Sequence, residues 1–172
     1  MAETARKNEV RRAQATAARL AAIQALYQID MGAASLDQAL AAATRNGAGA
    51  ELDDGRRLDA DPFVLTEIVQ GVVERTGAVD AMITAALSPK WRLERLEHVL
   101  RALLRAGAFE LLARPKVPAR AVLNEYVDLA HAFYDKAEAG LVNAVLDRLA
   151  RTLRPDEFAA EAPNPPEGTP DA

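Results

Sequence analysis

Basic side chains gather in two segments of this sequence, and they offer its clearest chemistry. Residues 1–19 carry five basic groups against two acidic ones, and residues 89–120 carry eight against three. Clustered guanidinium and ammonium groups attract anionic polymers, of which nucleic acid is the usual case. The alternative is a solvated surface, because runs of charge often serve only solubility. Composition alone leaves both interpretations open.

The residues that usually carry catalysis are few. The chain has no cysteine, which excludes disulfides, thiolate zinc sites and cysteine nucleophiles. Its two histidines, His98 and His131, fall on predicted polar helix faces without a nearby carboxylate pair. The sequence contains no phosphate-binding glycine loop, dinucleotide fingerprint or zinc-protease motif. We therefore predict that the protein is not an enzyme, has no catalytic residues and holds no metal or cofactor.

Length and hydropathy limit the architecture. A chain of 172 residues predicts one domain with tails. No apolar run reaches the roughly 18 residues of a membrane span, and the first residues lack the apolar core of a signal peptide. The net charge of −4 conceals an uneven distribution, because residues 155–172 carry five acidic groups and no basic one. We expect a cytoplasmic protein without membrane contact.

Hydrophobic periodicity predicts helices along most of the chain and no strand. The expected fold is all-α, a compact bundle of about seven helices. A flexible arm is expected at residues 1–9, a helical domain at 10–155 and an acidic, proline-rich disordered tail at 156–172. The expected helices cover residues 10–31, 35–43, 61–76, 80–87, 93–113, 118–133 and a last stretch ending before Pro155, with a polar loop at 46–60.

Local signals mark several helix ends. Ser35 followed by Gln38 is typical of a capping box, and Asp61 before a proline is typical of an N-cap with proline at the first helical position. Gly32 is expected to end the first helix. Gly71 lies inside an apolar helix, which suggests close packing against a neighbouring helix.

Four segments resemble, in order, the motifs of the NusB family of transcription antitermination factors. The first is ARLAAIQALYQ at residues 18–28, similar to the family's first-helix signature, and the second is LRALLRAGAFELL at 100–112. VPARAVLNEYVDLAHAF at 117–133 resembles V-P-x-x-x-x-I-N-E-x-[IV]-x-L-A-x-x-F, and LVNAVLDRLA at 141–150 resembles F-V-N-G-[VI]-L-D. The similarity covers about residues 10–155.

This resemblance implies a seven-helix fold in two subbundles and no catalysis. It also implies binding of the boxA element of ribosomal RNA leader transcripts together with the ribosomal protein NusE. The complex would join the elongating RNA polymerase with other Nus factors. By the same resemblance, Arg11, Arg12 and Arg19 would contact phosphates, and Gln24 and Tyr27 would lie further along the same side. Core packing is the alternative for Tyr27.

Other expected contacts follow from the same comparison. Leu141 stands where the family has an aromatic RNA-contacting residue, so base stacking worth about 1–3 kcal/mol would be lost there. Leu141 also belongs to the predicted core stripe. For NusE, the candidate contacts are Arg101, Arg105 and Glu125 on outer helix faces. The alternatives are a helical protein-interaction module, an RNA-binding module related to ribosomal RNA cytosine methyltransferases, and, for assembly, a homodimer.

Overall fold

Seven α-helices form the protein in the computed structural model, which describes residues 1–45, 50–51 and 55–161. The predicted all-α class is confirmed. The α-helices are α1 (Ala2–Asp30), α2 (Leu36–Arg45), α3 (Pro62–Glu74), α4 (Thr76–Ala86), α5 (His98–Ala113), α6 (Ala119–Phe133) and α7 (Lys136–Leu153). Short elements are strands β1 (Ala50–Glu51) and β2 (Arg57–Leu58) and the 3₁₀ helices η1 (Leu93–Arg95) and η2 (Pro155–Glu161).

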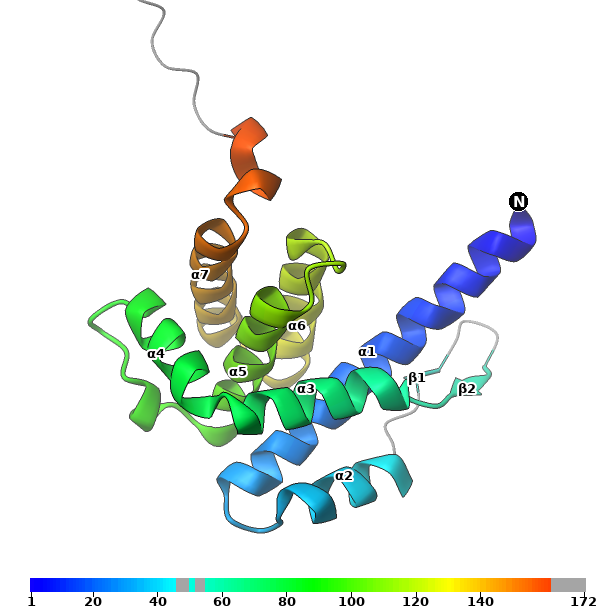
Figure 1. The fold of residues 1–172 in the computed structure, drawn as a ribbon, viewed down its shortest axis with the longest axis horizontal. Helices are drawn as coiled ribbons and strands as arrows, with labels where there is room; N and C mark the ends of the chain where they lie inside the picture. The colour runs from blue at the N-terminus through cyan, green and yellow to red at the C-terminus, as the bar shows by residue number, and fades with distance from the viewer. Residues whose placement is uncertain (46–49, 52–54, 162–172) are drawn as a thin grey trace, which may run out of the picture.

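The helices pack as two subbundles that share the first helix. Helices α1, α2 and α3 pack together, and helices α4 to α7 form a second group. Helix α1 lies across the molecule and also packs against α5 of the second group, while its first turns project from the body (Figure 1). The arrangement confirms the predicted two-subbundle fold and places the start of α1 where its side chains face solvent.

Two glycines let helices approach closely. A Cβ atom at Gly71 of α3 would lie 2.1 Å from Cζ of Phe109 on α5, so that ring occupies the space a side chain would need. A Cβ at Gly107 of α5 would lie 2.7 Å from a methyl group of Leu146 on α7. The close packing predicted for Gly71 is confirmed. Helix α5 is therefore packed closely against α3 of the first subbundle and against α7 of its own.

The predicted helix caps are present. The backbone N–H of Ser35 donates to Oε1 of Gln38 at 2.9 Å, and the N–H of Gln38 donates to Oγ of Ser35 at 3.2 Å. Oδ1 of Asp61 accepts from the N–H groups of Phe63 and Val64 at the start of α3. Gly32, with φ +69°, follows the end of α1 in the left-handed conformation that glycine adopts without strain.

Several boundaries differ from the predicted ones. Helix α1 begins at Ala2 rather than Val10, although the flexibility of the first nine residues stays a prediction. Gly77 does not break a helix, because α3 already ends at Glu74 and Gly77 lies in the first turn of α4. The predicted helix 93–113 is divided, since Leu96 has an extended backbone between η1 and α5.

Two segments carry structure that the sequence did not predict. Strands β1 and β2 pair antiparallel within the expected loop, with Ala50 opposite Leu58. Residues 155–161 form η2 instead of starting the expected tail, because Phe158 is buried and anchors the segment. The rest of that expected tail, residues 162–172, lies outside the described residues.

Candidate nucleic-acid interface

A groove of about 570 Å³ lies between α1 and the start of α6. Its wall on one side comes from α1 and on the other from the α5–α6 loop and the first turns of α6. The two basic segments of the sequence thus meet at one place on the surface. The residues that line the groove are Arg11, Arg12, Ala15, Arg19, Arg114, Lys116, Val117, Pro118, Ala121, Asn124 and Glu125.

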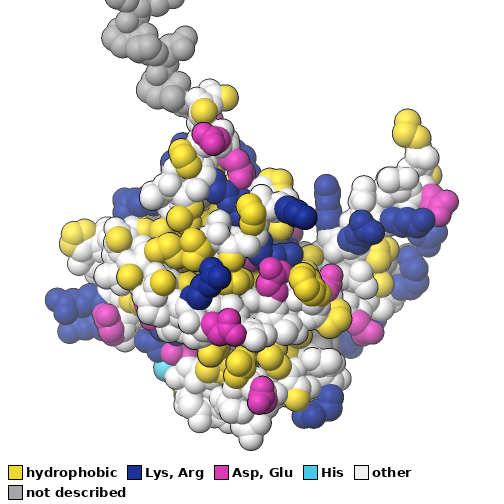
Figure 2. Space-filling model, in the orientation of Figure 1, with side chains coloured by type: hydrophobic (Ala, Val, Ile, Leu, Met, Phe, Trp, Pro, Cys, Tyr) yellow, Lys and Arg dark blue, Asp and Glu magenta, His cyan; other side chains and the backbone are white. Residues whose placement is uncertain are grey.

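The rim of the groove is basic and open to solvent. Arg11 and Arg12 are exposed on the projecting part of α1, and Lys116 is exposed on the opposite wall. Figure 2 shows Lys and Arg side chains gathered along this projecting helix. Their cationic groups can contact the phosphates of a nucleic-acid backbone that follows the groove. Two of the predicted phosphate contacts therefore lie in a suitable position.

Arg19 forms the floor of the groove and is already paired. Its guanidinium donates to both carboxylate oxygens of Glu110, at 2.7 and 3.0 Å, and only 5% of the residue is exposed. Arg114 donates to Glu110 at 2.6 Å, and the hydroxyl of Tyr126 donates to it at 2.6 Å. The buried carboxylate therefore joins α1, α5 and α6 beneath the groove.

The charges of this network stabilise one another. Burial alone would raise the pKa of Glu110, but the hydrogen bonds from Arg19 and Tyr126 and the charges of Arg19 and Arg114 together outweigh burial and lower that pKa below its usual value. Burial and the charge of Glu110 raise the pKa of Tyr126 well above its usual value. Glu110 is therefore ionised at neutral pH, and Tyr126 keeps its proton as a hydrogen-bond donor.

Glu125, predicted to contact NusE, lies in the groove wall instead of on a separate face. Its carboxylate accepts a hydrogen bond from Thr16 at 2.8 Å and lies 3.4 Å from the guanidinium of Arg19. The carboxylate adds negative charge to the floor between the basic rims. It links α1 to α6, and its role towards a partner stays a prediction.

The other predicted RNA contacts lie outside the groove. Gln24 is exposed and Tyr27 is 37% exposed, further along α1. The ring of Tyr27 packs edge-on against His98 with a centroid distance of 6.3 Å. Leu141 is 8% exposed and belongs to the core cluster, as its place in the apolar stripe suggested. The structure thus brings Arg11, Arg12 and Arg19 together and leaves these three apart from them.

Arg101 and Arg105, the other predicted NusE contacts, are used within the molecule. Arg101 donates to Asp30 at 2.7 and 3.1 Å, while Arg105 donates to Asp30 at 3.0 Å and to Asp80 at 2.8 and 2.9 Å. Their side chains are 13% and 15% exposed. They join α1 and α4 to α5, so a partner protein could contact only the small exposed part of each side chain.

His98 lies beside one carboxylate, that of Asp30, although no carboxylate pair faces it among the contacts of the described residues. Its Nδ1 lies 2.5 Å from Oδ2 of Asp30, a residue 68 positions away in the chain. Burial would raise the pKa of Asp30, but hydrogen bonds from His98, Arg101 and Arg105 outweigh it and lower that pKa to about 2. No local pattern in the sequence indicates this pair, because only the fold brings the end of α1 to α5.

Three residues important to the groove were not predicted individually. Arg114 and Lys116 belong to the basic segment 89–120, and that segment's charge was the signal that could have identified them. Glu110 is fully buried, yet its place in an apolar helix face was the signal for a charged partner elsewhere. Its partner, Arg19, can be identified only when the packing of α1 against α5 is known.

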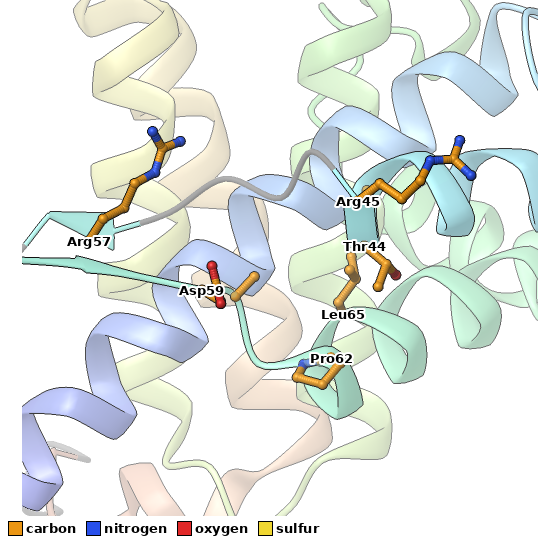
Figure 3. Close-up of a pocket in the computed structure, with 8 residues that line it drawn as sticks. Thr44, Arg45, Arg57, Asp59, Pro62 and Leu65 are labelled. Carbon is orange, nitrogen blue, oxygen red and sulfur yellow. The ribbon is translucent and has the colours of Figure 1, made fainter.

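A second hollow, of about 660 Å³, lies between α2, β2 and α3. Arg45 and Arg57 lie at opposite ends of this hollow, and their guanidinium groups do not converge (Figure 3). Within the described part of the chain, no group of three or more His, Cys, Asp or Glu residues is arranged to hold a metal ion. The basic groove is therefore the better candidate site.

An all-helical bundle with a basic groove along its first helix defines a class of small helical proteins able to bind a nucleic-acid backbone. The chain belongs to the NusB family, since the sequence model of the NusB family matches residues 16–151. Among the helices of the described residues, none is long and apolar enough to cross a membrane.

Curated relatives agree with this assignment. Transcription antitermination protein NusB of Rhodopseudomonas palustris (strain BisB5) is 48% identical over 142 residues, which cover 83% of this chain and 82% of that protein. The protein of the same name from Nitrobacter winogradskyi is 49% identical over 143 residues, which cover 83% of this chain and 89% of that protein.

Solved structures show the same fold. NusB of T. maritima superposes with a TM-score of 0.67 at 26% identity, over 87% of this chain and 96% of that one. A structure of antitermination factors NusB and NusE in complex with dsRNA has a matching chain with a TM-score of 0.63 at 25% identity, over 81% of this chain and 97% of that one.

Proposed function

We propose that this protein is a transcription antitermination factor that binds boxA-type RNA through the basic groove, together with NusE. The observation that carries the proposal is the convergence of two distant basic segments on one groove, with Arg11 and Arg12 on one side and Lys116 on the other. The antitermination proteins among its relatives and the NusB–NusE structure with dsRNA support it.

The proposed role is binding rather than catalysis, in the cytoplasm and within an elongating RNA polymerase complex that includes other Nus factors. Arg11 and Arg12 contact phosphates directly, while Arg19 contributes positive charge from the floor. Tyr27 and Gln24 extend the surface along α1. Leu141 is a buried core residue and contributes less than an exposed aromatic side chain would.

The test measures binding of a boxA-type RNA and a scrambled RNA, with and without NusE, at two salt concentrations. We expect tighter, sequence-selective binding when NusE is present. Arg12→Gln and Lys116→Gln should each weaken it and reduce the salt slope by about 0.7–1, because each removes one phosphate contact. Arg75→Gln is the matched control, since Arg75 is exposed at the end of α3 and does not line the groove.

Equal, weak binding to both RNAs that NusE does not change would contradict the proposal. That result would favour a helical protein-interaction module. An RNA-binding module related to the cytosine methyltransferases is less well supported, because the curated relatives named above are antitermination proteins that align over 82% and 89% of their own lengths.

A further inference from the structure

Arg154 and the helix η2 that follows it contact the two ends of the α5–α6 loop, which forms one wall of the basic groove. The loop spans residues 114–118 and carries Arg114 and Lys116 towards the groove. Residues 155–161 lie beyond residues 16–151, the part that matches the NusB family model. The contacts of η2 with the loop and its two flanking helices therefore belong to a segment that the family match does not cover.

Arg154, directly before η2, binds the backbone on the α5 side of the loop. Its guanidinium donates to the carbonyl oxygens of Glu110 at 2.9 Å and Leu111 at 3.0 Å, in the last turn of α5. It also donates to the carbonyls of Arg114 and Val117 within the loop. A cation suits the negative end of a helix dipole, so this side chain stabilises the end of α5 and holds the loop against it.

Glu157 binds the start of α6, directly after the loop. Its Oε2 accepts a hydrogen bond from the backbone N–H of Ala119, the first residue of α6, at 2.7 Å. Its Oε1 lies 3.2 Å from the guanidinium of Arg154. The carboxylate thus caps the start of α6 from a distant part of the chain, and carboxylates at helix starts are stabilising.

Phe158 anchors η2 in place. The side chain is 5% exposed, and the guanidinium groups of Arg120 and Arg151 lie 5.3 and 4.7 Å from the centre of its ring. Glu161 forms ion pairs with both of these arginines. The aromatic ring and the acidic residues therefore attach η2 to the start of α6 and the end of α7.

We propose that η2 is a positioning element of the RNA groove, which holds the α5–α6 loop in the shape that presents Lys116 to the RNA and keeps Arg114 paired with Glu110. This inference rests on the proposed RNA-binding function. Neither Glu157 nor Phe158 lines the groove, so both act through the loop.

The test compares Glu157→Ala with Asp156→Ala in the full chain. Both substitutions remove one negative charge from η2, but Asp156 is exposed and has no hydrogen bond or ion pair with the residues that the structure describes. Charge alone predicts that both variants bind RNA slightly more tightly. Positioning predicts the opposite sign for Glu157→Ala, a loss of about tenfold in affinity for boxA-type RNA with NusE, or roughly 1.4 kcal/mol.

Two further variants separate positioning from general stability. Phe158→Ala should weaken RNA binding, and Phe158→Leu should restore most of it because leucine can fill the same buried site. Ser35→Ala, which loses the cap of α2 far from the loop, should reduce stability and leave RNA affinity unchanged. Amide hydrogen exchange at Ala119 should be faster in Glu157→Ala than in Asp156→Ala.

The outcomes distinguish this inference from the proposed function. If the unmodified protein binds RNA and Glu157→Ala binds as tightly as Asp156→Ala, the positioning role is wrong. Unchanged hydrogen exchange at Ala119 in Glu157→Ala would also overturn it. If the unmodified protein does not bind boxA-type RNA, the proposed function fails. Faster exchange at Ala119 would then show only that η2 holds the loop, and its role in RNA binding would fail as well.

Discussion

Glu110 shows how much one buried carboxylate can depend on its neighbours. It accepts hydrogen bonds from Arg19, Arg114 and Tyr126, so four donor groups satisfy two oxygens that have no access to water. Such a group is stable only while its partners remain, because an uncompensated buried charge is costly. Arg19 is therefore a structural residue as well as a source of positive charge at the groove.

The first prediction concerns Arg19. Arg19→Ala should lower the free energy of unfolding by about 3–5 kcal/mol, because it leaves the buried Glu110 without its bidentate partner. Urea unfolding followed by circular dichroism measures the change. Arg12→Ala, about two helical turns further out and exposed, is the control and should change stability by less than about 0.5 kcal/mol. Equal stability of both variants would contradict this account of Glu110.

At the scale of residues, the sequence predicted the basic residues on the rim of the groove better than the residues on its floor. Arg11 and Arg12 stood out because they belong to the basic segment 1–19 and to the part of the first helix that resembles the RNA-binding side of the NusB family. Glu110 could not be assigned a partner, because Arg19 lies 91 positions away and only the crossing of α1 and α5 joins them. Arg101 and Arg105 looked exposed for the same reason.

At the scale of elements, close helix packing gives the second prediction. Gly71→Ala should destabilise the protein by about 1–3 kcal/mol, because the new methyl group overlaps the ring of Phe109 and α3 must move away from α5. Thermal unfolding measures the loss. Gly77→Ala is the matched control, since a Cβ at Gly77 of α4 meets nothing within 4 Å.

A double variant tests the cause of that loss. Gly71→Ala combined with Phe109→Leu should lose less stability than the sum of the two single changes, because the shorter side chain leaves room for the methyl group. Simple additivity would show that the overlap with Phe109 is not the reason for the effect.

The third prediction concerns the start of α2. Ser35→Ala should cost about 1 kcal/mol, because the N–H of Gln38 loses the hydroxyl that accepts its hydrogen bond. Ser35→Asp should retain most of the stability, since its carboxylate can accept the same bond. The measurement is the midpoint of urea unfolding, and a midpoint that Ser35→Ala leaves unchanged would contradict a stabilising cap.

Helices were predictable as elements because their caps and apolar stripes are local. The capping box at Ser35 and the cap at Asp61 depend on residues within one turn, so sequence spacing was sufficient. Helix η2 was not predictable, because its stability comes from the burial of Phe158 and from contacts of its side chains with α6 and α7, which its own sequence does not indicate. The division between η1 and α5 likewise depends on packing.

At the scale of the whole molecule, two carboxylates make stability depend on pH. Glu110 and Asp30 have folded-state pKa values below their usual values, and both join α1 to α5. A lowered pKa stabilises the protein above the pKa of the unfolded chain, and this stabilisation is lost as pH falls. For Asp30 the loss should occur between about pH 3.8 and about pH 2.

The fourth prediction tests this dependence. The free energy of unfolding should decrease from pH 5 to pH 2, and Asp30→Asn should give a shallower decrease because one titrating group is gone. Urea titrations at a series of pH values measure the slope. Asp156→Asn, which changes an exposed carboxylate, is the control and should keep the slope of the unmodified protein.

Helix α1 contributes to both subbundles over one continuous stretch of 29 residues. Neither group can therefore lose its structure while the other keeps α1 intact. We expect heat to melt the molecule as a single cooperative unit, with the calorimetric enthalpy equal to the van't Hoff enthalpy. Two separate heat-absorption peaks would mean that α1 can detach from one group and remain folded with the other.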